Sequence, residues 1–225
     1  DGRVLIPLDD AAAGAPSHSI HLKPLAEDAL SLPVRTGKAR VIGIEPASLV
    51  TKSLVREVKT DDAGCFQSAL NPGLTKIAVI ERHKRTGKLG IGILEGYGLT
   101  GGAIATTISH DSHNIVVAGD NDPDMLLAVR ELADMGGGIV SVHGGAIRRL
   151  PLPIAGLMTS ADPQEVNAVL HDMLVAARAE LGIPEDVEPF MTLSFMALPV
   201  IPELKLTARG LFNVNTFSFV GVEAD

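Results

Sequence analysis

Two histidines, a carboxylate and a carboxamide lie within five consecutive residues, from His110 to Asn114. The segment reads His-Asp-Ser-His-Asn, and apolar runs rich in β-branched residues flank it on both sides. An imidazole beside a carboxylate gains basicity and a fixed tautomer, which suits it to bind a metal, position a water or move a proton. We therefore take His110, Asp111 and His113 as candidate catalytic residues, in or beside an active-site wall. No substrate-binding residue is assigned.

Spacing alone leaves the geometry of this cluster open. Strand alternation places His110, Ser112 and Asn114 on one side, with Asp111 and His113 on the other. A helical turn instead brings the two histidines together, because they are three residues apart. The same residue types also occur in polar loops whose side chains satisfy backbone groups, so an ordinary connection is the alternative interpretation. An independent metal site on the two histidines is only weakly indicated, since no third ligand follows at a fixed spacing.

Apolar runs on either side of the cluster predict the strands that position it. Their near-continuous apolar character is typical of strands covered on both faces. Strands are expected at Ala39–Ile44, Ser53–Val58, Leu74–Glu81, Leu89–Leu94, Ala103–Ser109 and Ile115–Ala118, and a hairpin at Ile139–Val142 and Ala146–Leu150.

Two helices are also predicted. Each begins at an Asp-Pro pair, at Asp122 and at Asp162, and each ends at a glycine, near Gly136 and near Gly182. The last forty residues are apolar but interrupted by prolines, so we expect them to wrap the core as irregular strands. The predicted fold class is α/β (α+β), a mixed β-sheet packed with helices. A turn at 60–64 suggests a boundary between a short β-rich annex at 1–60 and a main domain at 61–225.

Composition excludes several classes of partner. The net charge is −8 and no extended cationic cluster occurs, so nucleic acid is not an expected partner. The most basic run, at 82–85, is interpreted as a solvated hairpin tip, with a structural ion pair between Glu81 and His83 beside it. The single cysteine, Cys65, excludes an intrachain disulfide and fits a reducing, cytoplasmic compartment. No apolar run reaches membrane-spanning length, so no membrane association is expected. The chain enters the apolar strand Val4–Leu8 without an initiator Met, as a piece of a longer polypeptide would.

Several long strings, taken in order, resemble the C-terminal region of bacterial adenine deaminases of the amidohydrolase superfamily. They are Glu81–His83, Gly96–Leu99, His110–Asn114, Leu150–Met158 and Phe190–Leu206. The resemblance implies that the whole protein hydrolyses adenine to hypoxanthine and ammonia in purine salvage. It implies a divalent metal, manganese or iron, that activates water in a barrel domain. It also implies that residues 1–60 are the tail of a composite β-sandwich and a linker.

The family's main metal ligands have no counterpart here, because the chain contains no His-x-His pair. We therefore expect no metal ligand of the main cluster in this chain, and no activity from the chain alone. The resemblance adds weight to His110, Asp111 and His113 without assigning them a chemical step. Our hypothesis is that they face the barrel mouth, where they help to close the site or to organise water. The expected partners are the protein's own N-terminal amidohydrolase barrel and further copies of itself in a homo-oligomer. A freestanding scaffold or oligomerisation domain without catalytic role is the alternative.

Overall fold

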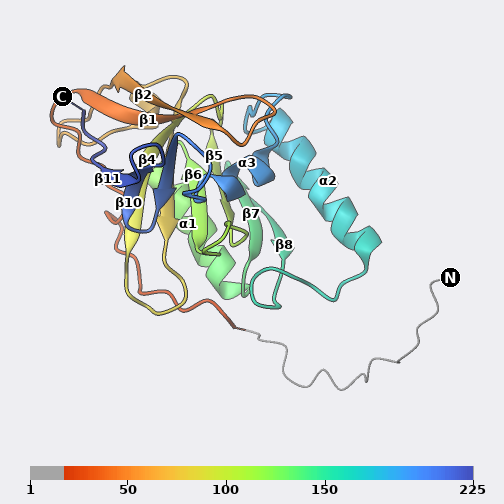
Figure 1. Cartoon of the computed structure of the whole chain (residues 1–225). Coiled ribbons are helices and arrows are strands. Elements are labelled where there is room, and N and C mark those ends of the chain that lie inside the picture. The colour runs from red at the N-terminus through yellow and green to blue at the C-terminus, as the bar shows by residue number, and fades with distance from the viewer. Residues whose placement is uncertain (1–17, 225) are drawn as a thin grey trace.

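The computed structural model describes residues 18–224 of the 225-residue chain, so the strand expected at Val4–Leu8 lies outside the described residues (Figure 1). Its centre is an eight-stranded sheet with the order β2-β1-β4-β3-β6-β5-β7-β8. The strands are β1 (Lys38–Ile44), β2 (Thr51–Glu57), β3 (Leu74–Ile80), β4 (Leu89–Glu95), β5 (Gly102–Thr106), β6 (Ile115–Gly119), β7 (Gly138–His143) and β8 (Ala146–Pro151). Only the β1–β4 pair is parallel, so the sheet is mixed and the predicted fold class is confirmed.

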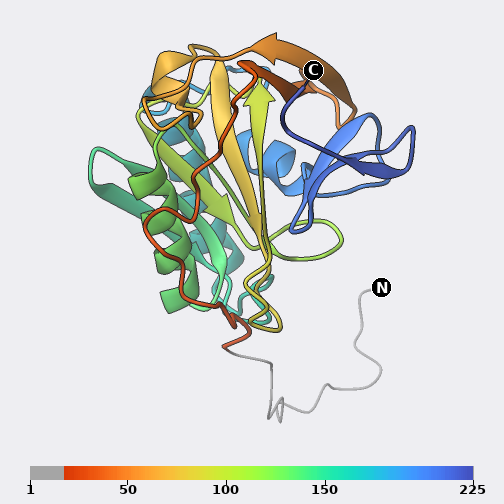
Figure 2. The same cartoon turned by 90° about the vertical axis from the view of Figure 1, so that its left-hand side faces the viewer.

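The two faces of this sheet are covered differently, as Figure 2 shows. One face carries α1 (Asp122–Asp134) and apolar side chains of the segment before β1. The other carries α2 (Pro163–Ala179), α3 (Pro189–Phe195) and a small three-stranded sheet. The small sheet has the order β11-β10-β9 and consists of β9 (Leu204–Thr207), β10 (Gly210–Asn213) and β11 (Ser218–Val220). A single 3₁₀ turn, η1 (Ser68–Leu70), precedes β3.

Burial of the central strands follows from this layering. Every residue of β5 and β6 is buried, as expected for strands covered on both faces. Strands β1 and β2 extend the same sheet through the β1–β4 pair, while the domain division at residue 60 stays a prediction. No helix in the described part of the chain combines the length and the apolar character needed to cross a membrane.

The two expected long helices form where the Asp-Pro pairs predict them. Asn121 caps α1 by accepting a hydrogen bond from the Asp124 N–H, one residue earlier than the cap expected at Asp122. Asp162 caps α2 and accepts from the Gln164 N–H at 2.7 Å. In both helices proline lies in the first turn, where its missing N–H has no cost.

The C-terminal forty residues contain the short strands β9 to β11, as expected, but also a helix that was not expected. Residues Pro189–Phe195 form α3, and Glu188 caps this helix by accepting a hydrogen bond from the Met191 N–H. The Glu188-Pro189 pair is thus a third acid-proline helix start of the kind that predicted α1 and α2. Strand β5 also ends at Thr106, short of the expected Ser109, and this early end creates the loop described next.

Candidate functional site

Residues 107–114 connect β5 to β6 on the side of the sheet that carries α3. Thr107 anchors the start of this loop: its N–H donates to the Gly138 carbonyl at 3.0 Å, and its hydroxyl donates to the Gly156 carbonyl at 2.5 Å. The same hydroxyl accepts the Gly138 N–H at 2.7 Å. At Gly137, whose φ is +109°, a Cβ would lie 2.5 Å from the Gly156 Cα, so only glycine permits this close approach.

The middle of the loop is tied to α3 and to its own turn. The His110 N–H donates to the Ser194 carbonyl at 3.0 Å, and the His113 N–H donates to the Ser109 carbonyl at 2.6 Å. His113 adopts a left-handed backbone conformation with φ of +48°. The neighbouring β3–β4 turn contacts the loop, because the His83 Nε2 lies 2.8 Å from the Ser112 carbonyl oxygen. The cluster is therefore a compact turn rather than a strand.

Arg82 fixes the end of the loop from inside the protein. Its guanidinium is buried and donates to the carbonyls of His113, Ser19 and Ala155. No carboxylate pairs with it among the described residues, and burial lowers the pKa of Arg82. A Cβ at Gly156 would lie 3.0 Å from this guanidinium, so glycine there lets the backbone pack against it. The basic run at 82–85 was expected at a solvated tip; this is correct for His83, Lys84 and Arg85, which are exposed, and wrong for Arg82.

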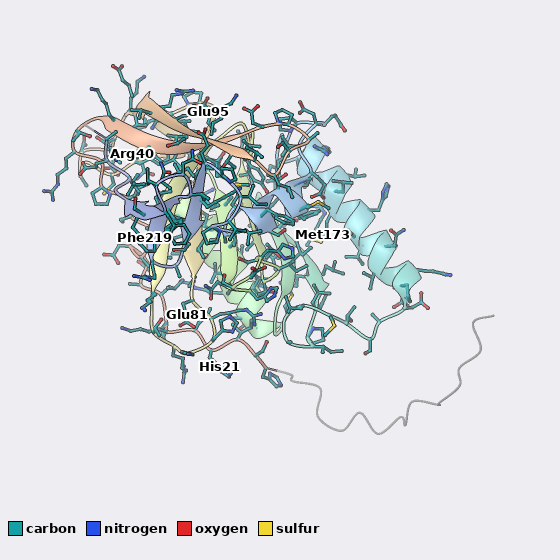
Figure 3. The ribbon with its side chains drawn as sticks, viewed as in Figure 1. His21, Arg40, Glu81, Glu95, Met173 and Phe219 are labelled. Atoms are coloured by element: carbon teal, nitrogen blue, oxygen red, sulfur yellow. The ribbon has the colours of Figure 1, made fainter. Side chains whose placement is uncertain are left out.

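The Glu81 side chain, unlike that of Arg82, bonds within its own turn and closes the β3–β4 connection. Its carboxylate accepts hydrogen bonds from the backbone N–H groups of His83, Lys84 and Thr86 and from the Thr86 hydroxyl. Burial raises the pKa of Glu81, but these bonds outweigh it and lower the pKa from 4.5 to about 2. Figure 3 shows Glu81 and His21 at the lower end of the sheet, with Phe219 above them. The expected Glu81–His83 ion pair is absent, since the bond is to the His83 backbone.

The structure brings two of the three candidate side chains together. The rings of His110 and His113 have centroids 6.1 Å apart in an edge arrangement, and His110 also lies 4.4 Å from the Phe195 ring. Asp111 is exposed and makes no hydrogen bond to either imidazole. Desolvation lowers the pKa of His113, and the nearby His110 and Arg82 add to this, while Asp111 opposes it. These effects favour the uncharged form of the His113 imidazole, which can accept a hydrogen bond.

Three buried polar atoms of this loop have no hydrogen-bond partner: the Ser109 Oγ, the His113 Nδ1 and the Asn114 Oδ1. Within residues 18–224, these are the only buried side-chain nitrogen or oxygen atoms left without one. Buried polar groups are nearly always hydrogen-bonded, because leaving one unpaired costs about 1–3 kcal/mol. Their concentration in one short loop makes it the part of the described chain whose polar groups are least satisfied. Sequence reasoning included Asn114 in the polar cluster but named neither Asn114 nor Ser109 as a site residue.

Two hollows flank the loop. One, of about 300 Å³, is lined by His110 together with Phe190 and Phe195 of α3 and Leu170 of α2. The other, of about 600 Å³, contains Asn114 and side chains of the small sheet. The loop does not fit a divalent metal by itself, because no three His, Cys, Asp or Glu side chains in the described part of the chain gather closely enough to hold one. The loop thus offers unpaired hydrogen-bonding atoms and an imidazole that favours its uncharged form, between two apolar surfaces.

Comparison with known proteins assigns the family. The model of the adenine deaminase C-terminal domain matches residues 48–218. The adenine deaminase of Nitratidesulfovibrio vulgaris (strain Hildenborough) is 56% identical over 223 residues, covering 99% of this chain and 38% of the relative. Adenine deaminase 2 of Carboxydothermus hydrogenoformans is 46% identical over 96% of this chain and 37% of its own length. The adenine deaminase of Bacillus licheniformis is 44% identical over 94% of this chain and 37% of its own length. The chain therefore belongs to the adenine deaminase C-terminal domain family and spans little more than a third of these curated relatives.

Proposed function

We propose that this chain is the C-terminal part of an adenine deaminase, whose full-length polypeptide converts adenine and water into hypoxanthine and ammonia in purine salvage. The names of the curated relatives support this activity, and the share of their length that the chain matches supports a further N-terminal portion. That portion, an amidohydrolase barrel, holds the catalytic divalent metal, manganese or iron. The chain alone does not deaminate adenine. The whole protein acts in the cytoplasm as a homo-oligomer.

The role of the chain is to close the active site with the 107–114 loop. His113, whose uncharged form is favoured, accepts a hydrogen bond there, and His110 presents its ring beside it. Ser109 and Asn114, whose buried oxygens are unpaired in the free chain, gain hydrogen-bond partners when the loop adjusts against the facing polypeptide. Arg82 and Ser194 keep the loop in place through its backbone. The single observation that carries this proposal is the set of unpartnered buried atoms concentrated in the loop.

The test needs a full-length protein. We suggest a hybrid in which this chain replaces the matching residues of the Nitratidesulfovibrio vulgaris relative, to which it is 56% identical. His110→Ala and His113→Ala in this hybrid should each lower kcat/KM for adenine by about 10- to 100-fold, as expected when a positioning group of an active site is lost. Metal content should stay unchanged, because neither histidine is a ligand of the main cluster.

A matched control is His171→Ala, since His171 is exposed on α2 and lies on no part of the loop. It should leave kcat/KM unchanged. Equal kcat/KM for the hybrid and both loop variants would refute the closure role and favour the alternative of a scaffold or oligomerisation domain. Deamination of adenine by the isolated chain would refute the proposed division between the two portions. Loss of bound metal in His110→Ala or His113→Ala would show instead that the loop itself ligates a metal.

A further inference from the structure

The small sheet carries three aromatic side chains, two of which are exposed. Three of the six phenylalanines of the chain, Phe212, Phe217 and Phe219, lie on β10, on β11 or in the turn between them. The Phe212 ring packs edge to face against each of the other two rings, with 5.2 Å between the ring centroids. Phe217 is 77% exposed and Phe219 is 44% exposed, so folding of this chain leaves much of their surface in water. Clustered exposed aromatic rings mark an interaction surface rather than a core.

These rings form one wall of the hollow of about 600 Å³, which we call the aromatic groove. Pro199 and Ala208 continue its apolar lining, and Val200, the residue after Pro199, is 67% exposed. Asn114, whose buried Oδ1 has no partner, lies in the same groove. The aromatic groove is therefore continuous with the 107–114 loop, and whatever fills the groove also covers one side of that loop.

Two cationic side chains at the aromatic groove have no carboxylate partner among the described residues. Arg209 lies over the Phe219 ring, with its guanidinium carbon 4.7 Å from the ring centroid, and Lys88 lines the groove as well. Within the described part of the chain, neither cation forms an ion pair with a carboxylate. Glu81 also lines the groove, but its oxygens accept four hydrogen bonds from its own turn. The groove thus fits an apolar segment that carries an acidic side chain.

We propose that the aromatic groove binds the N-terminal portion of the full-length polypeptide, through an apolar segment of that portion that carries an aspartate or glutamate. The curated relatives supply the reason to choose this occupant, since 62% or more of their length lies outside the region that this chain matches. The inference rests on the proposed function, because it takes the rest of the enzyme as the partner. It adds the surface at which the two portions meet.

Thiol labelling tests this proposal without any activity measurement. Cys65→Ser removes the single native thiol, and Phe217→Cys places a new thiol at the most exposed ring. The rate of reaction with a maleimide is then compared between the isolated chain and the hybrid protein. Because a covered thiol reacts only when its surroundings open, labelling at position 217 should be about tenfold or more slower in the hybrid.

Val55→Cys serves as the matched control, since Val55 is 51% exposed on β2, which is an edge strand of the main sheet. Its labelling rate should be the same in the isolated chain and in the hybrid. Arg209→Glu, added to the position-217 variant of the hybrid, should speed labelling several-fold, because it repels the acidic segment. Thermal melting of the isolated variants verifies that each remains folded.

Four outcomes would overturn the proposal. Equal labelling of position 217 in the two proteins would show that the groove stays open. Equal slowing at positions 217 and 55 would show that the protection is unspecific. Slow labelling of the isolated chain that depends on its concentration would assign the groove to a second copy, and slowing by free adenine would assign it to a small molecule. Failure of the histidine variants to change kcat/KM would refute loop closure but leave the labelling result intact, so the two proposals fail separately.

Discussion

Two neighbouring loops at one end of the main sheet treat their polar groups in opposite ways. In the β3–β4 turn, residues 81–88, the Glu81 carboxylate accepts four hydrogen bonds from within the turn itself. In the β5–β6 loop, residues 107–114, three buried polar atoms find no partner. The two loops touch, because Arg82 and His83 bond to the carbonyls of His113 and Ser112.

This difference is the one expected between a structural loop and a loop that meets a partner, as proposed for residues 107–114. A turn that satisfies its own groups gains little from further contact, whereas buried unpaired atoms lower the stability of the free chain until a partner or a water satisfies them. The complete turn also supports the incomplete loop, since both of the bonds that join them run from the turn to the loop backbone. The β3–β4 turn therefore supports the backbone of the candidate site.

Removal of Arg82 should have the largest effect on this arrangement. Arg82→Met leaves the carbonyls of His113, Ser19 and Ala155 without their donor, so the free energy of unfolding should fall by about 3 kcal/mol. Urea denaturation of the isolated chain measures this loss. Hydrogen exchange of residues 109–114 should accelerate in the same variant, because the loop loses its link to the turn.

Arg85→Met provides the control for the loss of a charge in the same turn. Arg85 is exposed and donates one hydrogen bond of 3.3 Å, to the Leu22 carbonyl, so its substitution should change the free energy of unfolding by about 0.5 kcal/mol or less. Equal losses of unfolding free energy for the two variants would show that Arg82 does not link the β3–β4 turn to the 107–114 loop.

Acidification should have the next largest effect, because it protonates the Glu81 carboxylate that closes the β3–β4 turn. The pKa of Glu81 is about 2 in the folded chain against 4.5 for the free side chain, so its contribution to stability is full above pH 4.5 and is lost as pH falls toward 2. Glu81→Gln removes this contribution, which we expect to be about 1–2 kcal/mol after allowance for solvent screening. The difference in unfolding free energy between the native chain and the variant should therefore shrink below pH 4.5.

Glu185→Gln is the reference for this titration, since the Glu185 carboxylate is 92% exposed and lies 3.7 Å from Arg178. Its substitution should change the free energy of unfolding little, because an exposed ion pair contributes little to stability. A difference for Glu81→Gln that stays constant through acidification would mean that the turn does not depend on the ionised carboxylate.

Sequence reasoning identified the scaffold more completely than the site. Periodicity and Asp-Pro starts predicted the mixed sheet and two of the three helices, because those signals are local. The position of His110 beside His113 was one of two geometries that spacing left open, and the structure selects the turn. The burial of Arg82 was not predictable from its basic neighbours, since it depends on Ser19 and Ala155, far away in the sequence. The unpaired state of Ser109 depends likewise on which groups surround it.

Removal of a hydroxyl at two positions of the 107–114 loop distinguishes a hydrogen-bonded hydroxyl from an unpaired one. Thr107→Val deletes a buried hydroxyl that bonds to Gly138 and Gly156, so the isolated chain should lose about 2 kcal/mol of unfolding free energy. Ser109→Ala deletes a buried hydroxyl without a partner, so the same chain should gain about 1 kcal/mol. In the hybrid protein the gain at Ser109 should disappear, because the other portion then supplies the missing partner. Denaturation of both variants in both proteins measures the four values. A loss at Ser109 in the isolated chain as large as that at Thr107 would mean that this loop, like the turn beside it, already satisfies its own polar groups.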